Sequence, residues 1–201
     1  MKNNKLSNSI ARVISTLFVP PTFTVFVFTY CAFIIEINVV NQVFIVGNSL
    51  IFGLILPVIV FFSMRKEKRI SDIDTSIKEE RNAPYLLNSI FCIAPIPSFL
   101  ILGVNYFFSL LWIIFFINTL ILYLINKRWK ISAHLLGAAI SLGAIMFLEG
   151  NPNYFLLGLI FMIAWARIKL KIHDFAQVIA GALLGFSITF ASLIIFYKYI
   201  I

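Results

Sequence analysis

Residues 106–126, YFFSLLWIIFFINTLILYLIN, contain no charged side chain and few polar ones. About 20 apolar residues in an α-helix cross the hydrocarbon core of a bilayer, so this run has the length of one span. Lys127 and Arg128 follow it directly, and cations at this position end a span at the lipid headgroups. The run therefore predicts a transmembrane helix, and with it a membrane protein.

The rest of the chain repeats this pattern. Only 12% of the 201 residues are charged and 61% are hydrophobic, which is too little charge to cover the surface of a soluble domain. Six further apolar runs are separated by short polar stretches or turn signals: 12–36, 43–64, 85–104, 132–148, 153–168 and 175–197. We therefore predict an all-α, polytopic membrane helical bundle of about seven transmembrane helices. It would form a single membrane domain over residues 1–201, and nothing in the sequence indicates an oligomeric state.

The basic residues are distributed unevenly between the two sides that seven spans would create. The formal net charge is +8, and every cation except Lys198 falls on one side. The cations of that side are Lys2, Lys5, Arg12, Arg65, Lys66, Lys68, Arg69, Lys78, Arg81, Lys127, Arg128, Lys130, Arg167, Lys169 and Lys171. An excess of Lys and Arg in short loops marks the cytoplasmic face. We predict a plasma (inner) membrane protein with its N-terminus inside and its C-terminus outside, whose positive charge serves topology and anionic lipid rather than nucleic acid.

Three polar stretches lie on this basic side: 65–84, 127–134 and 167–177. Two predicted spans separate each stretch from the next, so all three can meet at one site. The two histidines of the chain, His134 and His173, occur in the second and third stretches, where a helix enters the membrane. Ionisable groups at such positions are candidates for function, and the alternative is an interfacial histidine that caps a helix.

The residues around the two histidines resemble the type 2 phosphatidic acid phosphatase superfamily. Ser132-Ala-His134 is similar to the Ser-Gly-His element of that family. Arg167, followed after five residues by His173, resembles its third element, Arg-x5-His-x3-Asp. Gln177 stands at the position of that aspartate, which is similar to the dolichyl-diphosphatase-like branch. The resemblance covers the chain from about residue 65 to the end and implies a six-helix core acting on a lipid phosphate or diphosphate.

The first element of the family, Lys-x6-Arg-Pro, is altered in this chain. Arg81 is followed by Asn82 rather than proline, and Asp74 occupies the lysine position. Lys78 or Lys68 would then have to supply the missing cation.

The resemblance implies a metal-independent hydrolase without a cofactor. His173 would attack phosphorus and form a phosphohistidine, and His134 would protonate the leaving lipid oxygen and then activate water. Arg167 and Arg81 would hold the phosphoryl oxygens, because planar guanidinium groups suit spread negative charge.

Four further polar residues would assist this chemistry. Ser132 and Lys78 would bind the phosphate, and the backbone N–H groups that follow Ser132 would add donors at a helix start. Gln177 would orient the imidazole of His173 without adding charge, and Asp174 could supply a carboxylate.

Two other functions stay open. Gln177 and the altered first element also fit a catalytically degenerate membrane relative that binds anionic lipid. Asp72 and Asp74, followed by Arg81, faintly resemble the Asp-rich loop of magnesium-dependent membrane prenyltransferases, in which carboxylates bind magnesium diphosphate. The sequence contains no second carboxylate cluster of that kind.

Small residues predict where two of the helices approach each other. Gly181 and Gly185 have the spacing that permits close packing of helices. A small-residue face within the run 132–148 is the predicted partner, and it consists of Gly137, Ala138, Ser141 and Ala144. Packing of these two faces would bring the segments of His134 and His173 together.

Overall fold

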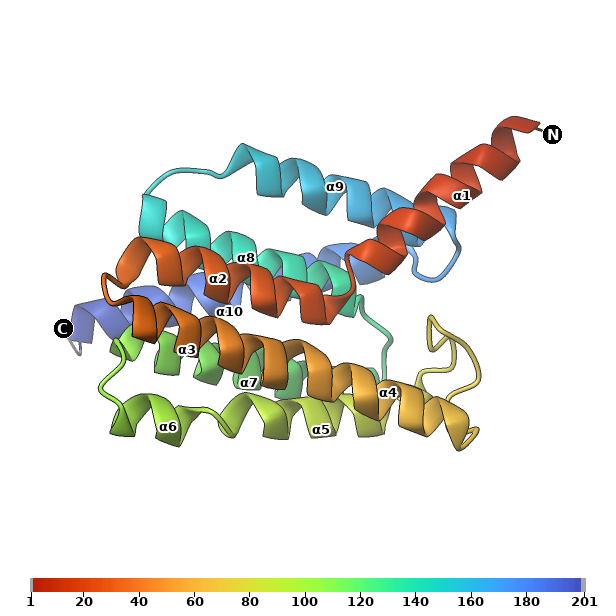
Figure 1. Cartoon of the computed structure of the whole chain (residues 1–201). Coiled ribbons are helices and arrows are strands. Elements are labelled where there is room, and N and C mark those ends of the chain that lie inside the picture. Colours follow the sequence, from red (N-terminus) through yellow and green to blue (C-terminus); the bar gives the residue numbers. More distant parts are fainter. Residues whose placement is uncertain (1, 200–201) are drawn as a thin grey trace. The chain divides into compact units, whose positions relative to one another are not determined.

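The computed structural model describes residues 2–199, and the regular structure in this part of the chain is helical, with no strand (Figure 1). The chain divides into two compact units: unit 1 combines residues 1–23 with 130–201, and unit 2 contains residues 24–129. The boundary falls inside α2 (Pro20–Ile35), so this helix belongs to both. The all-α class is confirmed, whereas a single domain over residues 1–201 stays a prediction.

Each unit is a set of packed helices. Besides the first turn of α2, unit 1 contains α1 (Lys2–Leu17), α8 (Ala133–Glu149), α9 (Tyr154–Lys169) and α10 (Phe175–Tyr199). Besides the rest of α2, unit 2 contains α3 (Val39–Leu50), the π-helical segment η1 (Ile51–Ile55), α4 (Leu56–Lys66), the 3-10 turn η2 (Glu79–Arg81), α5 (Asn82–Ile93), α6 (Ile96–Ile101) and α7 (Tyr106–Asn126).

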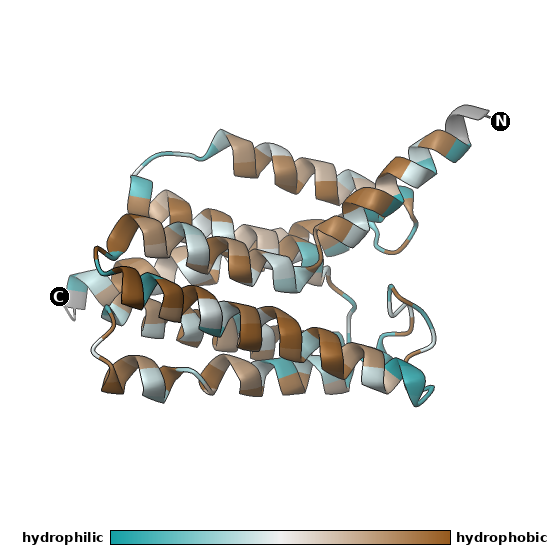
Figure 2. Cartoon of the chain, in the orientation of Figure 1, coloured by the Kyte–Doolittle hydropathy of each residue, from teal (hydrophilic) through white to brown (hydrophobic). Residues whose placement is uncertain are grey.

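Fewer helices than predicted have the length and composition of a membrane span. Four segments of the described chain do: Val39–Lys66, Glu79–Ile101, Tyr106–Asn126 and Phe175–Lys198. The bent pair formed by α1 and α2 would make a fifth. α8 is apolar but has 17 residues, about 26 Å of helix, which is less than the ~30 Å hydrocarbon core. A helical membrane protein is supported, and Figure 2 shows the apolar residues along these helices, but seven spans are not confirmed.

The first predicted span, 12–36, is wrong as a single helix. α1 ends at Leu17, and α2 begins at Pro20 after a sharp bend. Pro20 and Pro21 have no N–H to continue the hydrogen bonds of α1, whereas proline is well tolerated in the first turn of a new helix. The two prolines therefore end one helix and begin the next.

In unit 1, α8 and α10 lie side by side (Figure 1). A Cβ atom on Gly181 would overlap the carbonyl oxygen of Ser132, and one on Gly185 would overlap the carbonyl oxygen of Leu136. Only glycine allows two backbones to approach this closely. The predicted close helix contact at these two glycines is confirmed.

The small-residue face predicted for α8 has a different partner. The position of a Cβ on Gly137 lies 3.4 Å from the carbonyl oxygen of Pro20, and Ser141 donates a hydrogen bond of 3.3 Å to the carbonyl of Phe23. Both residues therefore face the start of α2. α10 instead contacts α8 at Leu136. Leu136 lies about 100° around the helix from Gly137, so α10 and the start of α2 pack on different faces of α8.

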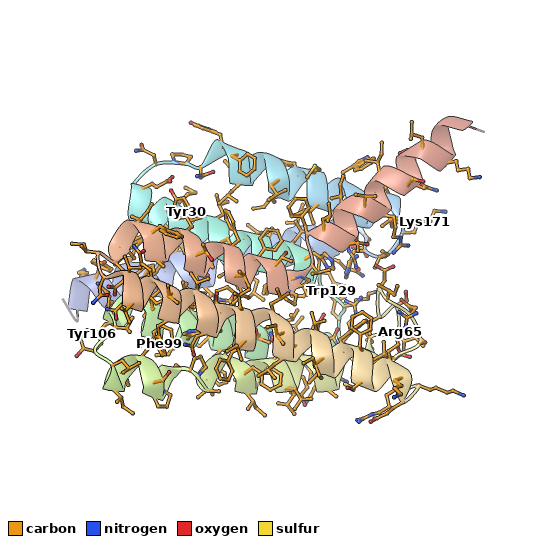
Figure 3. All side chains as sticks on the ribbon, viewed as in Figure 1. Tyr30, Arg65, Phe99, Tyr106, Trp129 and Lys171 are labelled. Atoms are coloured by element: carbon orange, nitrogen blue, oxygen red, sulfur yellow. The ribbon has the colours of Figure 1, made fainter. Side chains whose placement is uncertain are left out.

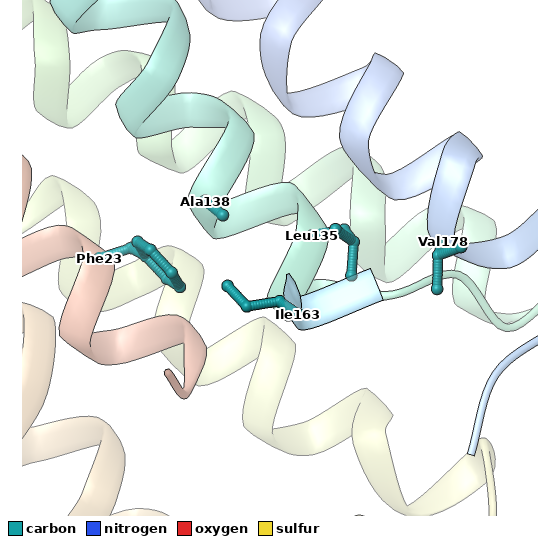
Figure 4. Packing of buried hydrophobic residues seen from close by; sticks show 5 residues of the cluster. All are labelled: Phe23, Leu135, Ala138, Ile163 and Val178. Carbon is teal, nitrogen blue, oxygen red and sulfur yellow. The ribbon is translucent and has the colours of Figure 1, made fainter. Parts of the chain in front are cut away.

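A compact apolar cluster supports the ends of these helices (Figure 4). Its buried members come from α2, α8, α9 and α10, and they are Phe23, Leu135, Ala138, Ile163 and Val178. Leu135 and Val178 directly follow His134 and Gln177 in the sequence. Burial of their side chains therefore holds the starts of α8 and α10 in place.

In unit 2, aromatic side chains join helices that are distant in the sequence. The rings of Phe28 on α2 and Trp112 on α7 have centroids 4.4 Å apart. Phe99, which is labelled in Figure 3, lies on α6, and its ring centroid is 5.2 Å from that of Phe44 on α3. Phe99 is fully buried. Contacts of this kind, together with packing of α5 along α7, form the core of this unit.

The π-helical segment η1 interrupts the long helix of unit 2 next to a proline. Pro57 has no N–H for the carbonyl of Gly53, so the regular hydrogen-bond ladder has to change at this point. A Cβ on Gly53 would lie 2.5 Å from Cγ2 of Thr24, so the absence of a side chain lets α2 approach here.

Candidate functional site

Arg167 lies in the last turn of α9, and the end of this helix explains its spacing from His173. The N–H of Ile172 donates to the carbonyl of Arg167 at 3.1 Å, and that of Lys171 donates to Ile168 at 2.9 Å. Lys171 has a φ of 56°, so it adopts the left-handed conformation that glycine usually provides after a helix end. This turn reverses the chain, and the N–H of His173 then also reaches the Arg167 carbonyl at 3.4 Å.

Asp174 and Gln177 form a reciprocal cap at the start of α10. Oδ1 of Asp174 accepts a hydrogen bond from the N–H of Gln177 at 2.8 Å, and Oε1 of Gln177 accepts one from the N–H of Asp174 at 3.4 Å. This is the capping box, which satisfies two N–H groups at a helix start. The carboxylate of Asp174 thus caps the helix by accepting a backbone N–H, which is its role at the position next to His173.

The same Gln177 oxygen determines which ring nitrogen of His173 carries hydrogen. Nδ1 of His173 lies 2.9 Å from Oε1 of Gln177. Because a backbone N–H also donates to this Gln177 atom, the atom is the amide oxygen, and Nδ1 must be a donor. The neutral imidazole of His173 therefore has its lone pair on Nε2, which is the form that a nucleophile requires.

Ser132 is the N-cap of α8 and joins this helix to the cap of α10. Its hydroxyl accepts a bond of 3.5 Å from the N–H of Leu135, and its own N–H donates to the carbonyl of Gln177 at 3.1 Å. The absence of a side chain at Gly181 makes room for the Ser132 carbonyl. Ser132 is fully buried in this structure, and its predicted role in phosphate binding stays a prediction.

Ser15 on α1 is a member of the site that the sequence did not reveal. Its carbonyl accepts a hydrogen bond of 3.1 Å from Nε2 of His134, and its hydroxyl accepts one of 2.5 Å from Nη1 of Arg167. A carbonyl can only accept, so Nε2 of His134 carries hydrogen and the neutral ring has its lone pair on Nδ1. In the sequence, Ser15 is only a polar residue within the first apolar run, and it lies before residue 65, where the family resemblance begins.

The hydrogen bonds of this region form a closed circuit around the starts of α8 and α10 and the ends of α1 and α9. Hydrogen bonds lead from Ser15 to Arg167, His173, Gln177 and Ser132 in turn; the chain itself joins Ser132 to His134, which bonds back to Ser15. Arg167 is 1% exposed and His173 is 5% exposed. The closed circuit therefore brings five of the predicted site residues together in one unit, and links a permanent cation to two histidines of opposite tautomer.

Arg81 and Lys78 belong to unit 2, where both stabilise the loop before α5. Arg81 is buried; its Nε donates to the carbonyl of Thr75 at 2.7 Å and its Nη2 to that of Asp74 at 3.0 Å. Nζ of Lys78 donates to the carbonyl of Lys127 at the end of α7, at 3.1 Å. Both cations have structural partners, and their predicted contact with phosphate stays a prediction.

Asp72 also serves this loop. Its carboxylate accepts hydrogen bonds from the N–H groups of Asp74 at 2.8 Å and Ser76 at 3.0 Å. Partial burial raises the pKa of Asp72, but these bonds and those of the Ser76 and Ser71 hydroxyls outweigh it, so the net pKa is lowered. The carboxylate oxygens of Asp72 thereby stabilise a turn, and these are the oxygens that magnesium binding would use. This favours a structural role for Asp72 over the magnesium-binding role of the prenyltransferase alternative.

Comparison with known proteins adds no relative: no protein-family model, no curated protein and no solved structure matches the chain.

Proposed function

We propose that this chain is a membrane phosphatase that hydrolyses a lipid phosphate or diphosphate through a phosphohistidine intermediate. The observation that carries the proposal is the closed circuit, in which Arg167 and His134 share Ser15 as a partner and His173 is joined to Arg167 through a backbone bond. The resemblance of Ser132-Ala-His134 and of Arg167-x5-His173 to the type 2 phosphatidic acid phosphatase superfamily supports the same reaction.

Arg167 would neutralise the phosphoryl group. A guanidinium cannot lose its charge in a protein, so its burial favours a ligand that is anionic and has several acceptor oxygens. A phosphate monoester or diphosphate has both properties, and bidentate contact with its oxygens would fix the phosphorus atom for attack. The cation would also stabilise the charge that spreads over these oxygens during transfer.

The opposite tautomers of the two histidines support a division of roles. In the first step, Nε2 of His173 would form a bond to phosphorus while the bond from phosphorus to the lipid oxygen breaks. The protonated ring of His134 would give its Nδ1 proton to that oxygen. In the second step, water would displace Nε2 of His173 from phosphorus and leave its proton on His134, which restores both rings.

Gln177 would keep Nδ1 of His173 as a donor throughout, because its amide oxygen is the acceptor. A neutral acceptor orients the ring but stabilises the imidazolium less than a carboxylate does. We therefore expect a slower enzyme than one that carries aspartate at this position.

The membrane orientation is part of the proposal. The excess of Lys and Arg on one side of the predicted spans puts the N-terminus and the two histidines at the cytoplasmic face of the plasma (inner) membrane. A reporter fused after Ile201 that is active only in the cytoplasm would overturn this orientation.

The decisive experiment measures phosphate release by purified full-length protein in detergent with EDTA present. Polyprenyl diphosphate and phosphatidic acid are the substrates, and release from either is the expected result. His173→Ala should abolish release, and His134→Ala should lower the rate by about 10²–10⁴-fold, the usual contribution of a general acid or base.

Lys169→Ala is the matched control, because it removes a half-buried cation from the same helix end as Arg167. It should retain the wild-type rate. If wild-type protein and His173→Ala behave alike, the chain binds anionic lipid without hydrolysing it, and the proposal is wrong. Release that disappears with EDTA would favour a metal-dependent reaction instead.

A further inference from the structure

We propose that Ser15 is a positioning residue of the phosphatase site, acting on Arg167 through its hydroxyl and on His134 through its carbonyl. This inference rests on the proposed function for its role in catalysis, but its geometry can be tested without activity. The two bonds, of 2.5 Å and 3.1 Å, cross 152 and 119 residues of sequence. A single residue of α1 thus touches both a phosphate-binding cation and a general acid.

The end of α1 makes this double contact available. Within a longer helix, the carbonyl of Ser15 would accept the N–H of the residue four positions on. α1 ends at Leu17, so the carbonyls of its last turn need other donors, and Nε2 of His134 is the donor at Ser15. The prolines that stop the helix thereby create the acceptor that selects the tautomer of His134.

The hydroxyl of Ser15 is a hydrogen-bond partner of the Arg167 guanidinium. It is 4% exposed and bonds a terminal nitrogen of Arg167, a group that the proposed function assigns to phosphate. Hydrogen bonds to a charged group fix its side chain more strongly than neutral ones do. Ser15 therefore contributes to the direction in which the guanidinium faces.

The first test compares Ser15→Ala with Ser15→Thr, which keeps the hydroxyl, and with Ser9→Ala as a control. Ser9 lies on the same helix, is exposed and bonds only Lys5 of its own helix among the contacts described. Ser15→Ala should raise the inhibition constant of inorganic phosphate about tenfold and lower kcat/KM by a similar factor. Ser15→Thr should restore both, and Ser9→Ala should change neither.

Wild-type values in Ser15→Ala would overturn the positioning role. A loss in both Ser15 variants that follows a fall in melting temperature would overturn it as well, because Ser15 would then act only on stability.

The second test uses the fact that the chain has two histidines. In protein labelled with ¹⁵N-histidine, His173→Asn leaves the single ring of His134, whose nitrogen shifts distinguish the tautomers. Hydrogen on Nε2 is the expected result, and hydrogen on Nδ1 would overturn the contact with Ser15. This result is independent of hydrolysis, so a wild-type protein without phosphatase activity would overturn the proposed function while the contact is still judged on its own.

A separate observation concerns the outer face of α1, which we infer to dock in the interface of an anionic membrane rather than to complete a fifth span with α2. Leu6, Ile10, Val13 and Leu17 recur at spacings of four, three and four residues, and each is 46–65% exposed. Ala11 and Ser15, on the opposite face, are buried in unit 1. α1 therefore has an inner face in the protein and an outer apolar stripe whose side chains are about half exposed in the described chain.

The charges beside this stripe indicate the kind of surface that it meets. Lys5 and Arg12 are exposed and lie on the flank of the stripe. An amphipathic helix with cations beside an apolar face lies in the plane of the headgroups and is attracted by anionic lipid. The partner is therefore the lipid surface, with aliphatic side chains in the acyl boundary and cations among phosphates.

Site-directed spin labels on full-length protein in nanodiscs test this placement. Cys31 and Cys92 are buried, so the label reacts with a cysteine introduced at Val13 or, as the control, at Thr16 on the polar flank. In phosphatidylglycerol nanodiscs, oxygen should relax the label at Val13 and an aqueous nickel reagent the label at Thr16. Equal access of the aqueous reagent to both positions, or the same pattern in phosphatidylcholine alone, would overturn the anionic docking surface.

Discussion

The two units hold their buried arginines in different ways. Arg81 of unit 2 donates to carbonyls six and seven residues earlier in its own loop. Arg167 of unit 1 donates to Ser15, 152 residues away. A bond of the first kind forms whenever the loop folds, whereas one of the second kind requires separate helices to meet. We therefore infer that Arg167, whose partner comes from a distant helix, belongs to a candidate site. Arg81, whose partners come from its own segment, stabilises a loop.

The other polar groups follow the same division. In unit 2, Asp72 binds the N–H groups of Asp74 and Ser76, and Glu80 accepts from the N–H and hydroxyl of Ser71. In unit 1, the closed circuit joins the ends of four helices. Four predictions test whether this difference separates function from structure.

The largest effect is expected from Gly181→Ala. A Cβ at this position would overlap the Ser132 carbonyl and push α8 away from α10, which breaks the closed circuit. Overpacking against backbone should lower the free energy of unfolding by about 3 kcal/mol and remove activity. Gly158→Ala is the control, because nothing lies within 4 Å of a Cβ there. It should raise stability by about 0.5–1 kcal/mol in the helix interior, as thermal unfolding in detergent would measure.

The next effect separates the two arginines. Arg167→Lys should lower kcat/KM by about 10²–10³-fold, because an ammonium cannot bind phosphate oxygens as a planar fork does. Arg81→Lys should instead lower the free energy of unfolding by about 1–3 kcal/mol through its lost backbone bonds, with activity retained. Phosphate release and thermal unfolding are measured on both variants. An equal loss of activity in the two would break the comparison and assign Arg81 to phosphate binding.

A smaller effect is expected from Gln177→Glu. Glutamate is isosteric, so it keeps both acceptor bonds of Gln177, to His173 and to the N–H of Asp174. Its charge stabilises the imidazolium of His173, and the rate of phosphate release should rise about tenfold. Gln177→Leu removes the acceptor and should lower the rate instead. A glutamate variant slower than wild type would contradict the orienting role of this side chain.

The smallest effect concerns pH and unit 2. The pKa of Asp72 is lowered in the folded chain, so its contribution to the loop is present above the ordinary pKa of about 4 and is lost as pH falls through the lowered value. Hydrogen exchange at the N–H groups of Asp74 and Ser76 should therefore accelerate in acid beyond its intrinsic pH dependence. In Asp72→Asn this acceleration should be absent. An identical pH profile in both proteins would show that the carboxylate does not hold the turn.

Much of the helix content was predictable from the sequence because it depends on local composition. The run 106–126 is α7 residue for residue, and Gly181 and Gly185 were correctly predicted to permit a close contact. The break at Pro20 was missed although its cause is local, since the apolar pattern continues across the two prolines. Seven spans are not confirmed, because α8 is apolar throughout but shorter than the helices that have the length of a span.

The candidate site was predictable in part. The spacing from Arg167 to Gln177 is local, and it is explained by the end of α9 followed by the capping box of α10. Ser15 was not predictable, since nothing in a serine on an amphipathic helix indicates a partner more than 100 residues away. Its role arises from packing of α1 against α9, which no short-range pattern encodes.

By itself, the sequence determined that this chain is helical and apolar enough for a membrane, and that two histidines and an arginine lie at helix ends. These properties follow from the periodicity, length and termini of single elements, where each residue acts on its near neighbours. Only the tertiary structure decided that the end of α1 supplies Ser15 to His134 and Arg167, and that Arg81 and Asp72 bond their own loop. The physical reason is that a side-chain partner is selected by the packing of surfaces, which depends on contacts between residues far apart in the chain.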